Sequence, residues 1–443
     1  MLLLPTRRAA IVAAVLAAAL LLYPGREVPV LATVAALAVL LVTAVLLDAL
    51  LGTSPAQVVV RREHPPVVVT DRDATVRWEI HSESRRTLRV AVADDLAPSL
   101  RARSRRFAAS VPPGGTARVT TTLTPLRRGR FELERLTVRI EGRLGLGARQ
   151  RAVPLHTTLR VHPPFRSRDE AELKIRQARI LEVGIRSAKG LGGGTEFEQL
   201  RDYGPDDEFR RIDWTATARA GRTIVRTYRS ERNQNVLVLL DNGRTMAGRV
   251  DGVPRVEHAM DATMMLTAVA TRLGDRCGLV TFDRHVRSIV PLARHTDQVA
   301  RVTEAMFALE PELSESDYSS VFAEVVARFR RRSMLVLLTD LVDQAVETSL
   351  LPALTLISRT HLVVVGAVRD PQVEAWAAGL QLDDIDADEA AYRQVAAVQA
   401  LSERRRTVAR LRGRGVTVVD AAPGRLSSEL ADAYLLVKRN GRL

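Results

Sequence analysis

The sequence predicts a multidomain chain with an N-terminal transmembrane α-hairpin, an all-β immunoglobulin-like sandwich and a doubly wound α/β domain built on a parallel sheet. Three observations support this. Two apolar runs open the chain, short segments rich in valine and threonine follow, and apolar and amphipathic segments then alternate to the end. The expected boundaries are 1–52 for the hairpin, 53–165 for the sandwich, 166–232 for a linker helix with a signature segment, and 233–443 for the α/β domain.

The two N-terminal apolar runs, 9–23 and 28–47, are separated by a short polar turn and predict a transmembrane hairpin. The second run approaches the ~20 residues that span a bilayer. The first is shorter, so it must recruit Leu2 to Leu4 or place Arg7 and Arg8 at the membrane interface. A cleaved signal peptide is the alternative for the first run, and the second run directly after it favours retention.

The charges that flank the hairpin predict its orientation. The flanking arginines are Arg7, Arg8, Arg61 and Arg62. Within the turn, Arg26 is balanced by Glu27. Because positively charged flanks stay on the cytoplasmic side, the soluble domains are expected to face the cytoplasm.

Composition limits the classes of function. The chain has 443 residues, of which 46% are hydrophobic, enough for several cores. Its single cysteine, Cys277, lies in an apolar segment, which excludes a disulfide framework. The net charge of +14 comes almost wholly from arginine, and no aromatic residues interleave with the arginine clusters to stack on bases. We therefore expect no nucleic-acid binding and favour an anionic membrane surface as the partner of this charge.

Residues from about 55 to 161 have the pattern of a β domain. Valine- and threonine-rich runs alternate with turn residues, and seven short strands at this spacing are typical of an immunoglobulin-like sandwich. The expected strands are 57–61, 74–81, 87–92, 117–123, 129–133, 137–141 and 158–161. They carry no catalytic chemistry, so we expect a binding or spacer module.

The C-terminal half alternates between amphipathic and apolar segments, which predicts βαβ units, a parallel sheet and helices on both of its faces. A linker helix is expected at 169–183. Further helices are expected at 255–272, 296–309, 321–330, 347–358 and 390–412. Strands are expected at 236–240, 277–282, 333–339, 362–368 and 416–419.

The first of these strands, 236–240, ends abruptly in Asp241, Gly243 and Thr245. It lacks period-two alternation, which indicates a strand covered on both faces. Ligands bind at the carboxyl edge of such a sheet, and a carboxylate followed by a hydroxyl offers oxygen ligands to Mg²⁺ or Mn²⁺. The pattern therefore predicts a divalent-metal site at Asp241.

The spacing of these residues resembles the Asp-x-Ser-x-Ser core of von Willebrand factor A-type domains, with glycine in place of the first serine. The resemblance implies two further contributions. Asp317 or Ser319 would replace the threonine ligand of the family, and Asp340 follows the second apolar strand. The implied metal-ion-dependent adhesion-like site comprises Asp241, Gly243, Thr245, Asp317, Ser319 and Asp340.

Helix capping offers a different interpretation of two of these residues. Aspartate is preferred directly before a helix, so Asp241 and Asp317 each fit an N-cap as well as a metal ligand. Together with Asp340 they stand at the ends of two apolar strands and at one helix start. This convergence favours a site.

Segment 195–219 interleaves charged and aromatic residues without helical or strand periodicity. Such charges are buried cheaply only when they pair, so we expect an ion-paired network around Trp214. Its expected members are Arg201, Asp207, Arg211, Asp213 and Arg219. The segment serves either as a rigid brace or as a docking surface, and both interpretations stay open.

The same segment resembles the signature of the bacterial family called domain of unknown function 58 (DUF58). The matching residues are Glu196, Arg201, Tyr203, Asp207, Arg210, Ile212, Asp213, Trp214, Ala218 and Arg219. The order of hairpin, β domain and von Willebrand factor A-like domain extends the resemblance over the whole chain. It implies a location at the bacterial inner membrane and a MoxR-type AAA+ ATPase as partner, in the assembly of membrane, envelope or enzyme complexes.

We expect the chain not to be an enzyme, because it contains no Ser-His-Asp order, nucleophile elbow, HExxH motif, Walker motif or Cys-His cluster. The favoured function is a membrane-tethered adaptor that holds Mg²⁺ or Mn²⁺ and binds an acidic residue of a partner through the ion. A metal-dependent phosphohydrolase is one alternative, since a carboxylate after a buried strand also begins phosphatase sites. A metal-free scaffold is the other.

Overall fold

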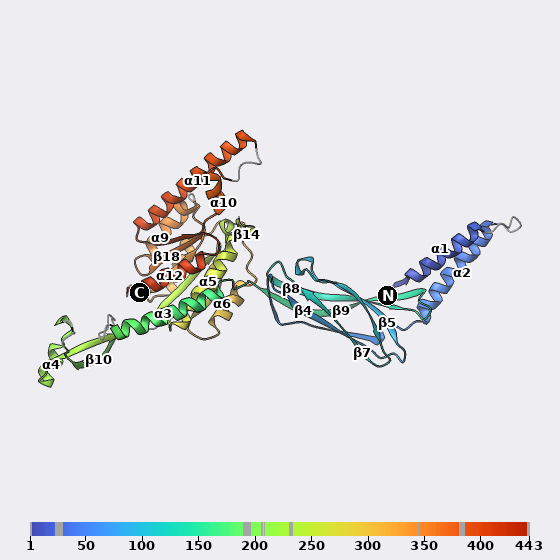
Figure 1. Cartoon of the computed structure of the whole chain (residues 1–443), viewed down its shortest axis with the longest axis horizontal. Helices are drawn as coiled ribbons and strands as arrows, with labels where there is room; N and C mark the ends of the chain where they lie inside the picture. The colour runs from blue at the N-terminus through green and yellow to red at the C-terminus, as the bar shows by residue number, and fades with distance from the viewer. Residues whose placement is uncertain are drawn as a thin grey trace. The chain divides into compact units, whose positions relative to one another are not determined.

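The computed structural model describes residues 2–22, 30–188, 196–204, 207, 209–229, 234–342, 345–380 and 386–440. The chain divides into two compact units, Met1–His162 and Pro163–Leu443 (Figure 1). The first contains apolar helices and a β domain, and the second contains an α/β domain and the signature segment. The predicted multidomain architecture with mixed sheets is confirmed.

Two apolar helices stand at the start of the chain, α1 (Arg7–Leu22) and α2 (Val30–Leu51). In the described part of the chain one helical stretch, Leu31–Gln57, is long and apolar enough to cross a bilayer. Helix α1 has 16 residues, about 24 Å of helix against a hydrocarbon core of about 30 Å. The predicted turn at 24–27 lies outside the described residues.

The expected extension of the first apolar run by Leu2 to Leu4 is wrong. These residues form strand β1 (Leu2–Pro5), which pairs antiparallel with strand β9 (Gly147–His162). The leucines belong to the edge of the β domain, because backbone pairing with β9 satisfies their N–H and C=O groups.

The end of α2 is tied to the same domain by Asp48. Its carboxyl oxygens accept hydrogen bonds from the backbone N–H groups of Leu144, Leu146 and Gly147 at 2.7, 2.8 and 3.0 Å. A Cβ at Gly142 would collide with this carboxyl group, so only glycine fits beside it. The buried Asp48 thus fixes the turn between β8 and β9 to α2.

Two sheets form the β domain, with their core between them. The smaller sheet has the antiparallel order β2 (Val58–Glu63), β4 (Ala74–Ser82), β7 (Thr116–Leu123). The larger has the order β1, β9, β8 (Gly129–Glu141), β5 (Leu88–Asp94), β6 (Arg106–Val111), and β3 (Val67–Val69) pairs in parallel with β9. Alternate residues of β4, namely Val76, Trp78 and Ile80, are fully buried, as the period of two requires.

Each of the seven predicted strand segments overlaps an observed strand, but two of them are halves of one strand. Segments 129–133 and 137–141 both belong to β8, whose pairing with β9 shifts register between Leu133 and Arg135. This bulge breaks the alternation that a sequence pattern relies on. Strand β6 was missed because it is rich in arginine, alanine and serine, which are weak strand formers.

A buried ion pair lies at the centre of this domain. Arg62 binds Asp94 through Nε at 2.9 Å and Nη2 at 2.5 Å, and neither side chain is exposed. Trp78 Nε1 donates to the same carboxylate at 2.7 Å. Arg62 is therefore not one of the free flanking charges assumed for the orientation of the hairpin, because Asp94 neutralises it inside the domain.

The α/β domain has a six-stranded sheet in the order β16 (Val286–Ala293), β15 (Arg276–Phe282), β12 (Asn235–Asp241), β17 (Met334–Leu338), β18 (Leu362–Val368), β19 (Thr417–Ala421). The strands from β15 to β19 pair in parallel, and β16 adds an antiparallel edge. The predicted alternation of strands and helices is found, with helix 255–272 in its predicted place. Strand β16 and helices α10 and α12 were not predicted.

Helices cover both faces of this sheet (Figure 1). One face packs against α3 (Arg168–Ala188), α5 (Arg255–Arg272), α6 (Gln298–Met306) and α12 (Leu426–Arg439). The other packs against α7 (Tyr318–Arg328), the π-helical turn η5 (Val346–Leu350), α9 (Leu351–Ile357) and the end of α11 (Ala387–Gly413). Helix α10 (Pro371–Ala377) lies against α11. The carboxyl edge of the parallel strands is where β12 and β17 deliver Asp241 and Asp340.

The central ion pair of the β domain yields a testable prediction. Asp94→Ala leaves the buried Arg62 guanidinium unpaired, so the free energy of unfolding of the β domain should fall by about 3–5 kcal/mol. Denaturant titration of the full chain, with Trp78 fluorescence as the readout, measures this loss.

The matched control is the neighbouring Asp95→Ala. Asp95 is 67% exposed and lies 3.5 Å from Arg135, so its loss should cost at most about 1 kcal/mol. Equal losses in both variants would contradict the central role of the buried pair.

Candidate functional site

Asp241 ends strand β12, and its side chain is fully buried. Its Oδ1 accepts hydrogen bonds from the Ser316 hydroxyl at 2.5 Å and from the backbone N–H of Gly243 at 2.8 Å. Its Oδ2 accepts from the hydroxyls of Tyr318 at 2.8 Å and Thr339 at 2.6 Å. Each carboxyl oxygen thus has two hydrogen-bonding partners from the chain itself.

Three oxygens of this cluster contact one another. The Tyr318 and Thr339 hydroxyls, which both lie against Asp241 Oδ2, are also 2.9 Å apart. Both hydroxyls are placed to donate to that oxygen. Burial raises the pKa of Asp241, although hydrogen bonds from Ser316 and Thr339 oppose the rise.

The same burial keeps Tyr318 in its protonated form. Desolvation and then the charge of Asp241 raise the pKa of Tyr318 well above its usual value. The phenol therefore stays a hydrogen-bond donor, and its ring packs edge-on against Phe282 with centroids 5.8 Å apart. The carboxyl group and its donors form one closed hydrogen-bonded cluster.

Gly243 is explained by this cluster. A Cβ at Gly243 would collide with Oγ of Ser316. Ser316, from the loop before α7, occupies the space next to Asp241 that a side chain at position 243 would need. The glycine that departs from the Asp-x-Ser-x-Ser pattern is therefore required by the hydroxyl of Ser316.

Hydrogen bonds from one side chain and from the backbone hold that loop against the end of β12. The side-chain amide of Asn242 donates to the carbonyl of Glu310 at 2.6 Å, and the backbone N–H of Glu312 donates to the carbonyl of Asn242 at 2.8 Å. The N–H of Arg244 donates to the carbonyl of Ser314 at 2.9 Å. The loop that carries Ser316 is thus a fixed cover over Asp241.

Asp340, shortly after β17, is 5% exposed and paired with two arginines. Arg404 Nη1 lies 2.9 Å from its Oδ1, and Arg255 Nε lies 3.3 Å from its Oδ2. Arg404 also binds Asp420 at 2.8 Å and donates to the carbonyl of Val368 at 3.1 Å. The charge of Asp340 is therefore neutralised by the protein.

The other predicted ligands take different positions. Thr245 is half-buried in the 3₁₀ turn η4 (Arg244–Ala247). Asp317 is exposed and caps α7, since its Oδ1 accepts the N–H of Ser320 at 3.0 Å, so the capping interpretation is confirmed for Asp317. Ser319 is exposed in the first turn of α7.

The von Willebrand factor A resemblance implies a divalent cation at Asp241, and the residues do not fit one in this arrangement. Both oxygens of Asp241 are engaged, burial raises the pKa of a carboxyl group that must be deprotonated to bind a metal, and two guanidinium groups neutralise Asp340. Among the described residues, no group of three or more His, Cys, Asp or Glu is placed to hold a metal. Binding of Mg²⁺ or Mn²⁺ stays a prediction.

The signature segment forms a β-hairpin. Strands β10 (Glu196–Asp202) and β11 (Ile224–Arg229) pair antiparallel, and their connection carries the 3₁₀ turn η3 (Phe209–Arg211) and helix α4 (Trp214–Ala220). We call this element the signature hairpin. Its charged residues determine the path of the connection.

Two carboxylates organise the signature hairpin. Asp207 is 7% exposed. Its carboxylate accepts hydrogen bonds from Nη1 and Nη2 of Arg201 at 2.8 and 2.7 Å and from the backbone N–H of Gly204 at 2.7 Å. This bidentate geometry is the strong form of an ion pair. Asp213 caps α4 through the N–H groups of Thr215 and Ala216 and accepts from Arg226 Nε at 2.7 Å.

The hydrogen bond from Arg226, followed by that from the Ala216 N–H, lowers the pKa of Asp213. The carboxylate is therefore charged at neutral pH and holds the start of α4 in place. Of the network expected from the sequence, the Arg201–Asp207 pair is confirmed, whereas the partner of Asp213 is Arg226, which had not been expected.

The predicted centre of that network is wrong. Trp214 is 61% exposed and meets Phe209, 69% exposed, edge to face with ring centroids 5.6 Å apart. Tyr203 is 39% exposed, and its hydroxyl donates to the carbonyl of Asp207 at 3.3 Å. The ion pairs therefore support an exposed aromatic surface instead of surrounding a buried tryptophan.

The remaining signature residues fall into two groups. Arg210 and Arg219 are exposed, and no ion pair is described for either within the part of the chain that the structure covers. The side chains of Glu196 and Arg211 lie outside the described residues.

Residues 199–410 match the family described as Protein of unknown function DUF58. The match supports the family resemblance and extends from the signature hairpin into α11. Uncharacterized protein Rv1480 of Mycobacterium tuberculosis and uncharacterized protein Mb1516 of Mycobacterium bovis are each 25% identical over 228 residues, which cover 48% of this chain and 71% of the relative.

Two solved structures show weaker likeness. BatB from Bacteroides thetaiotaomicron is 11% identical with a TM-score of 0.29, covering 47% of this chain and 99% of that chain. The CARDB domain of PF1109 from Pyrococcus furiosus is 15% identical with a TM-score of 0.17, covering 24% of this chain and 91% of that chain. Both TM-scores are below 0.5, so function is inferred from the residues alone.

The sequence pattern located the right segments but not the right side chains. The partners of Asp241 are Ser316, Tyr318 and Thr339, which lie in the helix-start and strand-end segments that the von Willebrand factor A resemblance indicated. The prediction chose Asp317 and Ser319 because a carboxylate or an exposed hydroxyl is a better metal ligand than a buried tyrosine. The arginines that bind Asp340 had no signal in the sequence.

Gly243→Ser restores the serine of the Asp-x-Ser-x-Ser pattern and tests the packing at the site. The new Cβ should displace Ser316, with a loss of about 1–3 kcal/mol in unfolding free energy. The double variant Gly243→Ser/Ser316→Gly should recover part of this loss. Denaturant titration of the full chain gives the coupling energy.

Gly413→Ser is the control, because no atom lies within 4 Å of a Cβ built there. Its effect should stay within about 0.5 kcal/mol. Additive losses in the double variant would contradict the contact between positions 243 and 316.

Asp241→Asn tests whether burial raises the pKa of Asp241. The folded-state pKa of Asp241 is raised above 3.8, so its contribution to stability is fully present below that pH and is lost as pH rises through the folded-state pKa. The asparagine variant does not titrate. The stability difference should therefore shift in favour of the variant as the pH rises above about 4, measured by thermal unfolding. A shift in favour of the wild type would show a stabilised carboxylate instead.

Proposed function

We propose that the chain is a membrane-anchored, non-enzymatic adaptor that binds a partner protein through the signature hairpin. In this proposal its α/β domain is a von Willebrand factor A-type scaffold that works without a metal, and its β domain is an immunoglobulin-like spacer. The apolar helix α2 anchors it in the bacterial inner membrane. The arginines 7, 8 and 61 beside the anchor favour soluble units that face the cytoplasm.

The observation that carries this proposal is the exposed pair of Phe209 and Trp214 on a braced support. A partner that covers these exposed aromatic side chains would remove a large apolar area from water, which favours binding. Tryptophan, tyrosine and arginine also contribute most of the binding energy at many protein interfaces. Asp207 fixes the backbone just before Phe209, and Asp213 fixes the backbone just before Trp214. Such preorganisation lowers the entropic cost of binding.

Charge defines the kind of partner surface. Arg210 directly follows Phe209, Arg219 lies in the same short helix as Trp214, and both arginines are exposed. A complementary partner therefore presents an apolar pocket with acidic groups at its rim. The DUF58 resemblance suggests a MoxR-type AAA+ ATPase for this role, with other membrane or envelope assembly proteins as clients.

The metal-free state is supported by the closed cluster at Asp241 and the neutralised Asp340. Those contacts also argue against a phosphohydrolase, because a buried carboxyl group with both oxygens engaged is not available as nucleophile or ligand. A metal-bridged adaptor is the second candidate. It is favoured by Asp241, Thr339 and Asp340 sharing one sheet edge, where Mg²⁺ or Mn²⁺ would have to displace two hydroxyl donors.

Trp214→Ala and Phe209→Ala should each weaken binding of the full chain to the MoxR-type ATPase of the same organism about tenfold or more, because they remove the exposed anchors. Co-purification and titration calorimetry of the detergent-solubilised chain measure this. Leu144→Ala, at a 66%-exposed leucine in the first unit, is the matched control and should bind normally.

Chelation separates the two candidates. In the metal-free adaptor, EDTA leaves partner binding unchanged and Mg²⁺ gives no binding heat with the chain alone. Loss of partner binding on chelation, reversed by Mg²⁺ and absent in Asp241→Ala, would establish the metal-bridged form. Normal partner binding by both aromatic variants would reject the signature hairpin as the docking surface.

A further inference from the structure

We propose that two copies of this chain associate through an antiparallel pair of α11 helices. The N-terminal half of α11 carries three large apolar side chains in contact with water: Tyr392 is 77% exposed, Val395 67% and Val398 51%. They recur every three residues, so they form one stripe along the helix. We call them the α11 stripe.

The α11 stripe points away from the domain. The residues of α11 that are buried are Ala397, Thr407 and Leu411, which lie on the opposite side of the helix. The neighbouring helix α10 contacts α11 elsewhere, with Trp376 under the guanidinium of Arg393 at 5.6 Å. Figure 1 shows the N-terminal half of α11 reaching beyond the sheet, with α10 beside it.

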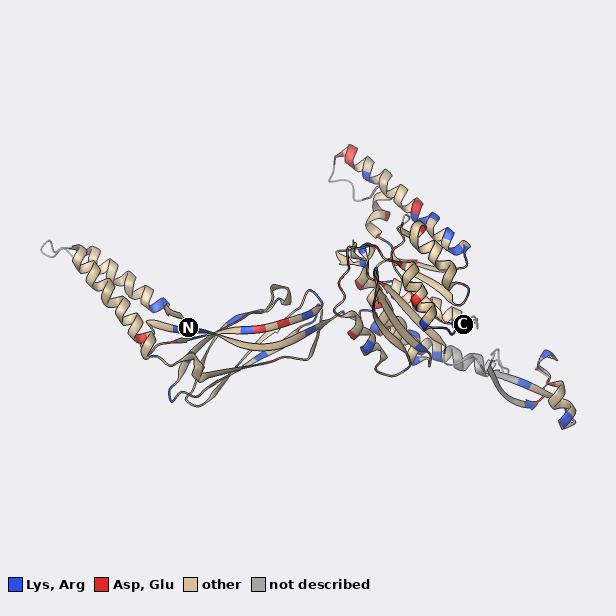
Figure 2. Ribbon diagram, turned by 180° about the vertical axis from the view of Figure 1, so that it is seen from behind, with Lys and Arg blue, Asp and Glu red and all other residues tan. Residues whose placement is uncertain are grey.

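The two ends of α11 carry opposite charge. Asp386, Asp388 and Glu389 stand at its start, whereas its last turns carry Arg405, Arg406, Arg410 and Arg412. Figure 2 shows acidic residues at the free end of this helix and basic residues near the sheet. Within the described residues, no ion pair is recorded for Asp388 or Arg406, so both are available to a partner.

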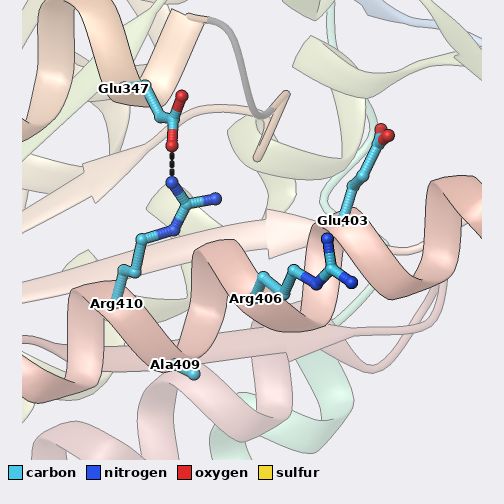
Figure 3. Close-up of a pocket in the computed structure, with 5 residues that line it drawn as sticks. All are labelled: Glu347, Glu403, Arg406, Ala409 and Arg410. Carbon is cyan, nitrogen blue, oxygen red and sulfur yellow. Dashed lines mark ion pairs between the residues drawn. The ribbon is translucent and has the colours of Figure 1, made fainter.

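The basic end opens into a shallow pocket on the same side as the α11 stripe. Glu403, Arg406, Ala409 and Arg410 of α11 line it together with Glu347 of η5. Figure 3 shows Arg410 paired with Glu347, while Arg406 points along α11 without a partner among the residues drawn. The α11 stripe therefore continues into a hollow that has one unpaired cation.

These features select a second copy of the chain as the occupant. In an antiparallel pair, the acidic start of each helix meets the basic end of the other, and Val395 and Val398 of the two α11 stripes lie near the middle. Asp388 and Arg406 are 18 residues apart, about 27 Å, and are symmetric about residue 397, next to Val398. A parallel pair would place like charges together. A twofold interface of this kind uses the same surface twice and closes on itself.

The association is independent of the signature hairpin, so it extends the proposed adaptor without depending on it. A dimer would present two signature hairpins to a partner assembly. Dimerisation is tested by measuring the mass of the chain alone, so its result does not depend on whether the chain binds the ATPase.

The test is the mass of the full chain in detergent, measured by light scattering after size exclusion, with detergent subtracted. The wild type should be a dimer, and Val395→Asp should be a monomer. Val342→Asp, at a 43%-exposed valine elsewhere, is the matched control and should stay dimeric. Asp388→Arg and Arg406→Asp should each weaken the dimer about tenfold, and the double charge reversal should restore it.

Cysteine crosslinking fixes the orientation. The native Cys277 is buried, and burial raises its pKa to about 12, so it does not compete. The double variant Asp388→Cys/Arg406→Cys should form an intermolecular disulfide on mild oxidation, and Asp388→Cys alone should not. A monomeric wild type, or crosslinking of Asp388→Cys alone, would overturn the proposal.

Discussion

The α/β domain depends on complete internal hydrogen bonding of one buried carboxyl group. Asp241 has no contact with water, and an unpaired carboxyl group in that position would cost several kcal/mol. Its four donors come from three separate segments: the turn after β12, the start of α7 and the end of β17. The carboxyl group therefore joins these three segments at the carboxyl edge of the sheet.

The same use of acidic side chains recurs through the chain. Asp94 binds Arg62 and Trp78 in the core of the β domain, and Asp275 accepts hydrogen bonds from Tyr434 and Lys438 beneath the C-terminal helix. These three acidic residues, Asp94, Asp241 and Asp275, are thus buried and paired inside the domains, whereas many arginines stay on the surface. The net charge of +14 is in this sense a property of the surface, available to an anionic membrane or an acidic protein.

Two exposed apolar surfaces, the signature hairpin and the α11 stripe, lie on elements that the fold holds in place. The signature hairpin and the α11 stripe each place large apolar side chains in water, on supports fixed by ion pairs or by packing against the sheet. Contiguous exposed apolar side chains often mark a protein–protein interaction site. An adaptor needs binding surfaces that exist before the partner arrives, and both elements satisfy that condition without any catalytic group.

The sequence by itself determined the order of the domains, the parallel strands and the position of Asp241 at a strand end, because apolar periodicity and turn residues are local properties. It also indicated that segments 316–320 and 339–340 meet this strand. Only the tertiary structure decided which side chains make contact. Ser316 excludes a side chain at position 243, Arg255 and Arg404 neutralise Asp340, and Asp213 pairs with Arg226 while Trp214 stays exposed. Such choices depend on distances between residues far apart in the chain, which periodicity does not encode.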